Sequence, residues 1–334
     1  MKFFQHLIIL ALAISFSHLT GCKSGTPKIG VLIHGYDNER WVKDKNYLVD
    51  DLTKRGAEIL LEVADNDQQK QISQARSMID NGAQVLIVIC INQDEAAKIV
   101  EMAHEADVKV IAYDRLINGC KLDYYVTTNS TRTGELQASY LTSLKSNGKY
   151  ALICGSKHDN NSMKLFLGQM KVLQPFMEKG NIELVYSEFT DDWSAAQGTL
   201  HTKRIIEQNK DSITAIITGS DALADGALVA LKEKGMTGKV LLAGQDCELY
   251  NVKEIINGNQ TCDILKPLKQ MASITSEIAV ALALEKPLTM KFTHESNGKA
   301  LVNSILLDPV IVNKNNIEKT VVSSGFYSAE ELRK

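Results

Sequence analysis

The chain has 334 residues, of which 44% are hydrophobic, and its 37 basic and 40 acidic side chains give a formal net charge of -3. At roughly 150 residues per domain this length favours two domains over one. The nearly balanced charge, without a basic stripe, lacks the electrostatic footprint of a nucleic-acid-binding protein, so a small neutral ligand fits the composition better.

The first residues have the pattern of an export signal, with a positive Lys2 and an apolar run at 7–16. That run is shorter than the roughly 20 apolar residues that a membrane-spanning helix needs. The residues Leu19, Thr20, Gly21 and Cys22 follow it and resemble the lipobox of bacterial lipoproteins, in which a peptidase cuts before a cysteine that is then acylated.

We therefore expect residues 1–21 to be a lipoprotein signal peptide and Cys22 to carry the lipid, with residues 22–27 as an anchor linker. Acyl chains contribute roughly 0.8 kcal/mol per buried CH₂, so a multiply acylated cysteine holds a protein firmly on a membrane. The expected location is periplasmic, with contact to the membrane only through this anchor.

From about residue 28 onwards, strand-like apolar runs alternate with helical patterns, which is typical of βαβ units and a parallel sheet. In one clear cycle, capping residues at 65–67 precede an apolar helical face at 72–79, and Asn81 and Gly82 end the helix before a strand at 85–89. Similar cycles fill the second half. The other strands are expected at 29–33, 108–112, 150–154, 215–218, 240–243 and 262–265, and the other helices at about 94–105, 194–209, 222–234 and 271–284.

Two similar halves predict an α/β protein with two Rossmann-like lobes, each a parallel sheet flanked by helices. The chain has only 5 prolines and no Ser/Gly-rich linker, so we expect several short crossings, near residues 130, 265 and 300, rather than a flexible tether. The predicted N-terminal lobe is 28–130 with 266–300, and the C-terminal lobe is 131–265 with 301–334. Such a multi-crossing hinge allows the lobes to close around a ligand in the crevice between them.

Six of the predicted strands end at a cluster of polar side chains. Ligands of open α/β sheets bind beyond the carboxyl ends of the strands, so these clusters are candidates for ligand contact. Arginine offers two donors in a fixed fork, aspartate accepts from two hydroxyls, and tryptophan offers a flat apolar surface. The clusters contain Glu39, Arg40 and Trp41; Asp114 and Arg115; Asp159, Asn160 and Asn161; Ser220 and Asp221; Gln245 and Asp246; and Lys266. Together they fit a polyhydroxylated ring.

Each cluster also has a purely structural interpretation. Trp41 could be a core aromatic at the start of a helix, and Asp114 with Arg115 could be a surface ion pair of little energetic value. Asp159 could simply cap the following helix, and Lys266 could be a hinge residue. The seven histidines are scattered, so we expect neither a metal site nor a cofactor.

The cysteines after Cys22 lack CxxC or Cys/His spacing. We expect most of them to be buried thiols, which behave as small hydrophobic groups. A disulfide between Cys247 and Cys262 stays open, because spacing alone cannot decide it.

Read in order, these segments resemble the periplasmic sugar-binding proteins of ABC transporters, and within them the D-xylose-binding branch. The resemblance runs from about residue 28 to about 332. It implies the two-lobed fold known as periplasmic binding protein type I. The segments that carry it are Glu39-Arg40-Trp41, Ala112-Tyr113-Asp114-Arg115, Gly134-Glu135-Leu136-Gln137-Ala138, Asp159-Asn160-Asn161, Gly168-Gln169-Met170-Lys171-Val172-Leu173, Gly244-Gln245-Asp246, Lys266-Pro267 and Val312-Asn313-Lys314-Asn315-Asn316-Ile317.

The resemblance implies a monomeric receptor that binds an aldopentose, D-xylose above all, and delivers it to an ABC permease without catalysis. Ser220 departs from the family pattern, which has an asparagine there, and His34 stands where an acid is expected; both departures bear on sugar choice. The implied sugar contacts are Arg40, Trp41, Arg115, Asn161, Trp193, Ser220, Asp246 and Lys266, with His34, Asp114 and Asp159 as rim residues.

Other classes of function can be weighed on the same residues. The motifs GxGxxG, GxxxxGK and GxSxG, which would indicate a dehydrogenase, a nucleotide-binding enzyme or a hydrolase, are missing. A glycosidase built on Asp114 and Asp246 would need a defined carboxylate separation. A sugar-responsive repressor would carry a DNA-binding segment where this chain has its export signal. A receptor that reports to a membrane sensor kinase or chemoreceptor stays open, because both jobs use the same closed, liganded form.

Overall fold

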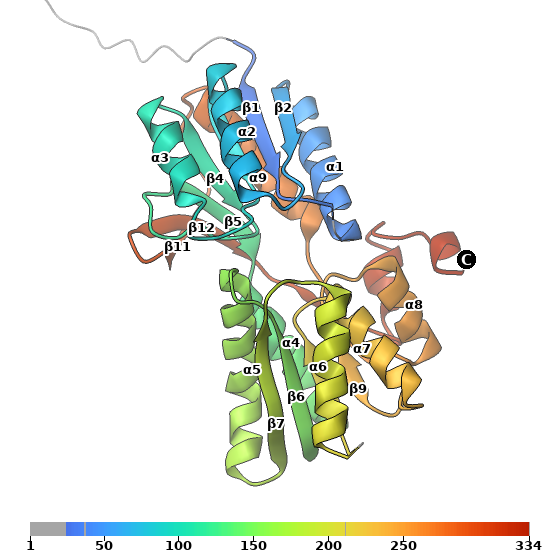
Figure 1. Ribbon diagram of the computed structural model, residues 1–334. Helices are drawn as coiled ribbons and strands as arrows, with labels where there is room; N and C mark the ends of the chain where they lie inside the picture. The colour runs from blue at the N-terminus through green and yellow to red at the C-terminus, as the bar shows by residue number, and fades with distance from the viewer. Residues whose placement is uncertain (1–24, 37, 211, 334) are drawn as a thin grey trace, which may run out of the picture.

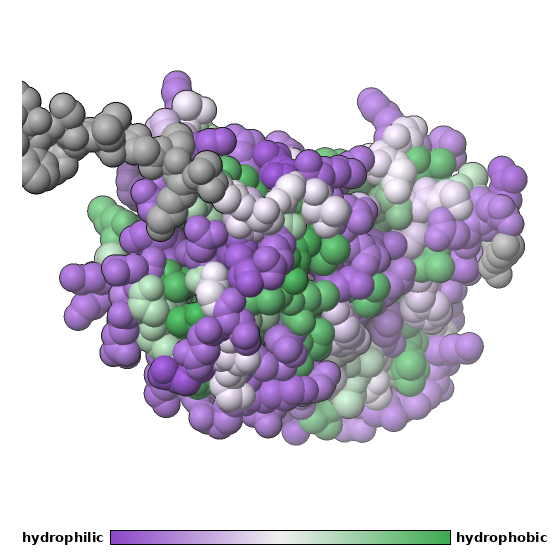
Figure 2. Space-filling model, turned by 90° about the horizontal axis from the view of Figure 1, so that it is seen from above, coloured by the Kyte–Doolittle hydropathy of each residue, from purple (hydrophilic) through white to green (hydrophobic). Residues whose placement is uncertain are grey.

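The computed structural model describes residues 25–36, 38–210 and 212–333. They form two lobes, each a mainly parallel sheet with helices on both faces (Figure 1). The lobes lie end to end and are joined by several connecting segments of the chain. A view onto the end of the N-terminal lobe shows a largely hydrophilic surface interrupted by smaller apolar areas (Figure 2). The predicted fold class is confirmed.

The N-terminal lobe contains a seven-stranded sheet in the order β11-β12-β5-β4-β3-β1-β2. All its strand pairs are parallel except the edge hairpin of β11 and β12. One face is covered by α1 and α9, the other by α2 and α3. The elements are β1 (Lys28–Ile33), α1 (Glu39–Lys54), β2 (Glu58–Val63), α2 (Gln68–Asp80), β3 (Val85–Val88), α3 (Ala97–Glu105), β4 (Lys109–Tyr113), β5 (Tyr124–Thr128), α9 (Leu268–Ala283), β11 (Thr293–Ser296) and β12 (Leu301–Leu307).

The C-terminal lobe contains a six-stranded sheet in the order β13-β10-β9-β8-β6-β7, parallel except for β13. Helices α4 and α5 cover one face, α6 and α7 the other, and α8 lies at the edge with the C-terminal segment. The elements are α4 (Ser130–Leu144), β6 (Gly148–Ser156), α5 (Asn160–Glu178), β7 (Ile182–Thr190), α6 (Ala195–Gln208), β8 (Ala215–Thr218), α7 (Asp221–Glu233), β9 (Leu241–Ala243), α8 (Leu249–Asn257), β10 (Cys262–Leu265), β13 (Val310–Asn313), a π-helical turn (Glu318–Val322) and α10 (Ala329–Arg333).

Glycines allow the paired helices of this lobe to pack closely. A Cβ atom on Gly134 of α4 would lie 2.1 Å from the carbonyl oxygen of Leu165 in α5, and one on Gly226 of α7 would lie 1.9 Å from the carbonyl oxygen of Ala195 in α6. Ordinary carbon contacts are near 3.5–4.0 Å. Any larger residue would therefore push these helix pairs apart.

The chain crosses between the lobes at three places: from β5 to α4, from β10 to α9 and from β12 to β13. The prediction of the third crossing near residue 300 is wrong, because the chain crosses one strand later, after β12. Residues 301–307 form β12, which pairs with β5 and packs Ile305 and Leu307 against the core under α1 and α9. They belong to the N-terminal lobe, and the third crossing lies at Asp308 and Pro309.

Strands with fully buried apolar runs, such as β1, β3 and β8, lie where the sequence predicts them. The partly exposed strands β2, β7, β11, β12 and β13 lack such runs and were not predicted. Strand β5 was also not predicted: it is buried, but its sequence YYVTT is not an apolar run. The five cysteines within the described residues are free and buried, so Cys247 and Cys262 form no disulfide. Residues 1–21 and Cys22 lie outside the described residues, and none of the described helices is long and apolar enough to cross a membrane.

Candidate functional site

All eight side chains predicted as ligand contacts line one pocket between the lobes. We call it the inner pocket; its lining is Asn38, Arg40, Trp41, Asp114, Arg115, Asp159, Asn161, Trp193, Ser220, Gln245, Asp246 and Lys266. These residues follow β1, β4, β6, β7, β8, β9 and β10, so the pocket is built at the carboxyl ends of strands from both sheets.

Arg40 is the centre of the charge network in this pocket. Because α1 begins at Glu39, Arg40 stands in the first helical turn, where its side chain is only 3% exposed. Its guanidinium donates to Asp44 at 2.9 Å, to Asp114 at 2.5 Å and, across the interlobe space, to Asp246 at 3.3 Å. Burial alone would lower the pKa of Arg40, but these carboxylates raise it well above its usual value. The buried cation is therefore held by paired anions.

Asp114 is the main buried partner of that cation within the N-terminal lobe. It follows β4 in the left-handed region, with φ of 64°, which is uncommon for a residue other than glycine and frequent at functional sites. Burial alone would raise its pKa, but Arg40, Lys266 and Arg115 hold that pKa well below its usual range. Asp114 was predicted at the rim; it lies instead at the buried centre, 2% exposed.

Arg115 reaches the other lobe through Asp159, with 3.1 Å between its Nε and the carboxylate. Asp159 also caps α5 by accepting from the backbone N–H of Asn161 at 2.9 Å. Asp159 thus caps α5 and also lines the pocket. Burial raises the pKa of Asp159, and Arg115 opposes that rise. Like Asp114, Asp159 is buried rather than at the rim.

Asn161 ties the two lobes together at the same edge. Its amide nitrogen donates to the backbone carbonyl of Asp114 at 3.0 Å, and its amide oxygen accepts from the Ser130 hydroxyl at 2.9 Å. A side chain that both donates and accepts in the pocket is suited to a hydroxyl group, which does the same.

The two tryptophans occupy different positions in the pocket. The Trp41 ring lies 4.1 Å from the Arg40 guanidinium carbon and 5.2 Å from that of Arg115, measured to the ring centroid. His34 meets its edge with 4.4 Å between ring centroids, so His34 packs beside Trp41 instead of forming the predicted rim. Trp193 stands between β7 and α6. Neither indole N–H has a hydrogen-bond acceptor among the described residues.

Ser220 combines two roles, and Lys266 adds a further cation to the pocket. Ser220 is the N-cap of α7, where its hydroxyl oxygen accepts from the N–H of Leu223 at 3.3 Å and its proton can still be donated. Lys266, directly after β10, places its ammonium 3.1 Å from Asp246 and 3.7 Å from Asp114.

Asp246 sits on an unusual turn. Its φ is 107° and that of Cys247 is 53°, both in the left-handed region. The turn is supported from below, because the N–H of Cys247 donates to Asp263 at 3.3 Å and that of Glu248 donates to Asp221 at 2.7 Å. Burial raises the pKa of Asp221, and proximity to Asp263 raises it further; burial likewise raises that of Asp263. Burial and mutual proximity therefore both disfavour the charged forms of these two carboxyl groups.

The list of predicted contacts omitted two lining residues, Asn38 and Gln245. Gln245 directly precedes Asp246 in a polar cluster already singled out, so its position carried a signal. Asn38 precedes the first turn of α1 but makes no side-chain capping bond there, and nothing in the sequence separates it from an ordinary cap.

The lobes are in direct contact around the inner pocket. Two ion pairs described above, Arg40 with Asp246 and Arg115 with Asp159, link the lobes. In addition, the Asn160 amide donates to Asn118 at 2.6 Å and Lys164 pairs with Glu295 at 2.7 Å, again between the lobes. The inner pocket keeps a volume of about 20 Å³, which is space for roughly one water molecule. Anything larger than a water molecule can enter only if these contacts open.

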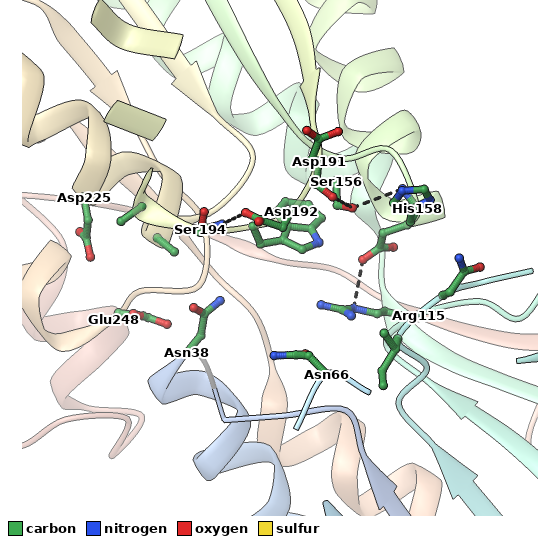
Figure 3. A pocket seen from close by; sticks show the side chains of 16 residues that line it. Asn38, Asn66, Arg115, Ser156, His158, Asp191, Asp192, Ser194, Asp225 and Glu248 are labelled. Atoms are coloured by element: carbon green, nitrogen blue, oxygen red, sulfur yellow. Dashed lines mark hydrogen bonds and ion pairs between the residues drawn. The ribbon is translucent and has the colours of Figure 1, made fainter. Parts of the chain in front are cut away.

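A larger hollow, the vestibule, lies outside the inner pocket and shares Asn38, Arg115, Asp159 and Trp193 with it. Its volume is about 610 Å³. In Figure 3, Asn38 and Asn66 stand on one side, while Asp192 and Ser194 stand across from them. Within the described residues no group of three or more potential metal ligands gathers.

The sequence matches a family described as the periplasmic binding protein domain over residues 29–287. It is 37% identical, over 305 residues, to D-xylose-binding periplasmic proteins of Haemophilus influenzae and Escherichia coli, covering 91% of this chain and 92% of each relative. It is 32% identical to a multiple sugar-binding periplasmic receptor of Rhizobium radiobacter, again over 91% and 92%.

Among solved structures, a solute-binding protein of an ABC transporter from Clostridium phytofermentans, with bound β-D-glucose, aligns with a TM-score of 0.84 at 27% identity and covers 91% of this chain and 99% of that one. A carbohydrate-transporter solute-binding protein from Chloroflexus aurantiacus, in complex with D-glucose, aligns with a TM-score of 0.84 at 26% identity, over 92% and 98%.

Proposed function

The chain belongs to the periplasmic binding protein family, and we propose on that premise that it is a sugar receptor whose lobes close on a monosaccharide. The proposed ligand is an aldopentose, D-xylose, since relatives with 37% identity over most of the chain are D-xylose-binding proteins. The receptor binds without chemical conversion and hands the sugar to an ABC permease.

One observation carries this proposal: side chains from the strand ends of both sheets meet in a single pocket as arginines, carboxylates, three amides and two indoles. A pyranose presents an apolar C–H face and a rim of hydroxyls that donate and accept. Arginine forks and carboxylates match the rim, and an indole face matches the C–H face. Hydrogen bonds to charged groups contribute about 1.5–3 kcal/mol each, so two or three of them dominate specificity.

The arginine bridges across the interlobe space support a closing mechanism. Arg40 and Arg115 already bond carboxylates of the opposite lobe. In the liganded form sugar hydroxyls would stand between these groups and accept from the guanidinium while donating to the carboxylate. The same charges then hold both the lobes and the ligand.

The affinity expected for such a site is within physical limits. A micromolar dissociation constant corresponds to about -8 kcal/mol. Over the roughly ten heavy atoms of a pentose this is about -0.8 kcal/mol per atom, below the ceiling of about -1.5 for very small ligands. Micromolar or moderately tighter binding is therefore reasonable.

Calorimetric titration of the purified protein with D-xylose, L-arabinose, D-ribose, D-glucose and D-galactose tests the proposal. Micromolar or tighter binding of D-xylose, with weak responses to the others, is the expected result. Preference for another sugar would keep the receptor function and move the specificity assignment to Ser220. Absence of heat for all five sugars, in protein shown to be folded, would refute the proposal.

The membrane anchor is a separate proposal, because Cys22 lies outside the described residues. We infer that Cys22 is acylated and holds the receptor on the outer side of the cytoplasmic membrane or on another periplasmic surface. Replacement Cys22→Ala should release the protein into the soluble fraction of fractionated cells. A variant that stays in the membrane fraction as wild type does would contradict the anchor.

A further inference from the structure

Two glycines lie directly beneath the ring of Trp193. Gly155 is the last residue but one of β6, and Gly219 directly follows β8. A Cβ atom on Gly155 would lie 1.9 Å from Cη2 and 2.1 Å from Cζ3 of Trp193, and one on Gly219 would lie 3.0 Å from the same Cζ3. Ordinary contacts between carbon atoms are about 3.5–4.0 Å. The outer ring of the indole thus occupies the space that two side chains would fill.

The backbone does not explain why these positions are glycine. Neither Gly155 nor Gly219 is among the positive-φ residues, whereas Gly148 at the start of the same strand β6 has φ of 109°. An alanine could adopt the backbone conformation of Gly155 without strain of the left-handed kind. The requirement for glycine therefore comes from the ring above it.

The opposite side of Trp193 faces the ligand space. Trp193 lines both the inner pocket and the vestibule. Its neighbours Asp191 and Asp192 are exposed loop residues, and the backbone carbonyl of Asp191 accepts from the Ser156 hydroxyl of the same lobe at 3.1 Å. Support from the two glycines below decides how far the ring stands out into the interlobe space.

We propose that Gly155 and Gly219 are positioning residues for Trp193: the absence of their side chains forms a seat that sets the depth of the indole ring and hence the room left for a sugar. The inference rests on the proposed function, because it concerns the width of the same site. It adds two residues that touch no ligand to the set that determines which ligand fits.

Gly155→Ala is the sharper test. The Cβ on Gly219 would also meet the backbone nitrogen of Gly155 at 2.8 Å, whereas the nearest atoms above Gly155 belong to Trp193 and to the Ser162 hydroxyl at 2.6 Å. To restore an ordinary contact, the indole must rise by roughly 1.5 Å into the ligand space. We expect D-xylose to bind about tenfold more weakly, or worse, since each tenfold step needs only about 1.4 kcal/mol.

A double-mutant cycle separates this mechanism from general damage. Trp193→Phe removes the outer ring that carries Cη2 and Cζ3, so Gly155→Ala in that background should change affinity by less than about twofold. Ser162→Ala, alone and combined with Gly155→Ala, controls for the neighbouring hydroxyl and should not restore binding. If Gly155→Ala lowers the affinity for D-xylose equally with Trp and with Phe at position 193, the proposal is refuted.

A spectroscopic readout tests the seat without any ligand. Trp41 and Trp193 are the two tryptophans of the chain, so in a Trp41→Phe background the emission reports Trp193 alone. Gly155→Ala should shift this emission to longer wavelength as the ring moves into the hydrated vestibule, with circular dichroism unchanged. An unshifted emission would refute the inference. If wild type binds none of the sugars, the receptor proposal fails, while this fluorescence comparison still decides the seat.

Discussion

Replacement of Arg40 by methionine should lower the free energy of unfolding by about 3–5 kcal/mol, the cost typical of removing one partner from a buried ion pair. Methionine keeps an unbranched apolar stem but removes the guanidinium that bonds Asp44, Asp114 and Asp246. The side chain is 3% exposed, so water cannot easily replace the lost donors. The Lys266 ammonium stays near Asp114 and Asp246, which favours the lower end of the range.

The chain offers a matched control at the C-terminal end of the same helix, where Arg55 is the C-cap. Arg55 pairs with Asp51 at 2.6 Å, also four residues apart, but the Arg55 side chain is 31% exposed. Arg55→Met should cost less than about 1 kcal/mol, as expected for a solvated pair. Urea unfolding followed by circular dichroism compares both variants with wild type. Tryptophan emission is unsuitable for this purpose, because Arg40 lies against the Trp41 ring.

The deficit of Arg40→Met should shrink in acid. In wild type the pKa of Asp114 is depressed, so its stabilising contribution is present above the pKa of an unfolded aspartate, about 4, and is lost as the pH falls below it. Without Arg40, burial raises the pKa of the unpaired carboxyls, so the folded variant binds protons before the unfolded chain does. A deficit below about 1 kcal/mol at pH 7, or one that grows from pH 7 to pH 4, would refute this reasoning.

Three further outcomes are expected. Asp221 and Asp263 have raised pKa values, so the folded state binds protons that the unfolded chain releases. The melting temperature of the wild type should therefore fall from pH 5 to pH 8, and Asp263→Asn should make this fall smaller. An equally steep fall in the variant would be contrary evidence. Glu295→Gln removes the interlobe partner of Lys164 and should speed sugar release by up to about fivefold in stopped-flow measurements, without loss of secondary structure. An unchanged release rate would count against a role of this ion pair in holding the lobes closed. Burial raises the pKa of Cys90 and of Cys154 to about 12, so Ellman's reagent should react slowly with folded protein at pH 8 and promptly after unfolding, whereas fast reaction of the native protein would contradict buried thiols.

Much of the site could be predicted because it obeys a rule of topology. Arg40, Arg115, Asn161 and Asp246 each follow a buried apolar strand, and parallel strands bring their carboxyl ends to one edge. The order of strands and helices along the chain was therefore enough to predict that these residues lie close together. The sugar identity depends on finer geometry, and position 220 shows why: Ser220 lines the pocket but also caps α7.

The parts that sequence could not supply depend on partners distant along the chain. β12 was assigned to the wrong lobe because its half-buried residues carry no mark of the strand they join, which is β5 some 180 residues earlier. Asp114 was placed at the rim because its burial depends on Arg40 and Lys266 from other segments. The seat under Trp193 likewise exists only once three strand ends have met.

The three crossings have a consequence for the order in which the protein can fold. The sheet of the N-terminal lobe needs β12, and its core needs α9, both made after the whole of β6 to β10. During synthesis the first five strands therefore emerge long before the segments that cover and complete them. The C-terminal lobe in turn waits for β13. Neither sheet is complete until the chain up to about residue 313 has left the ribosome, so both complete lobes form only at the end of synthesis.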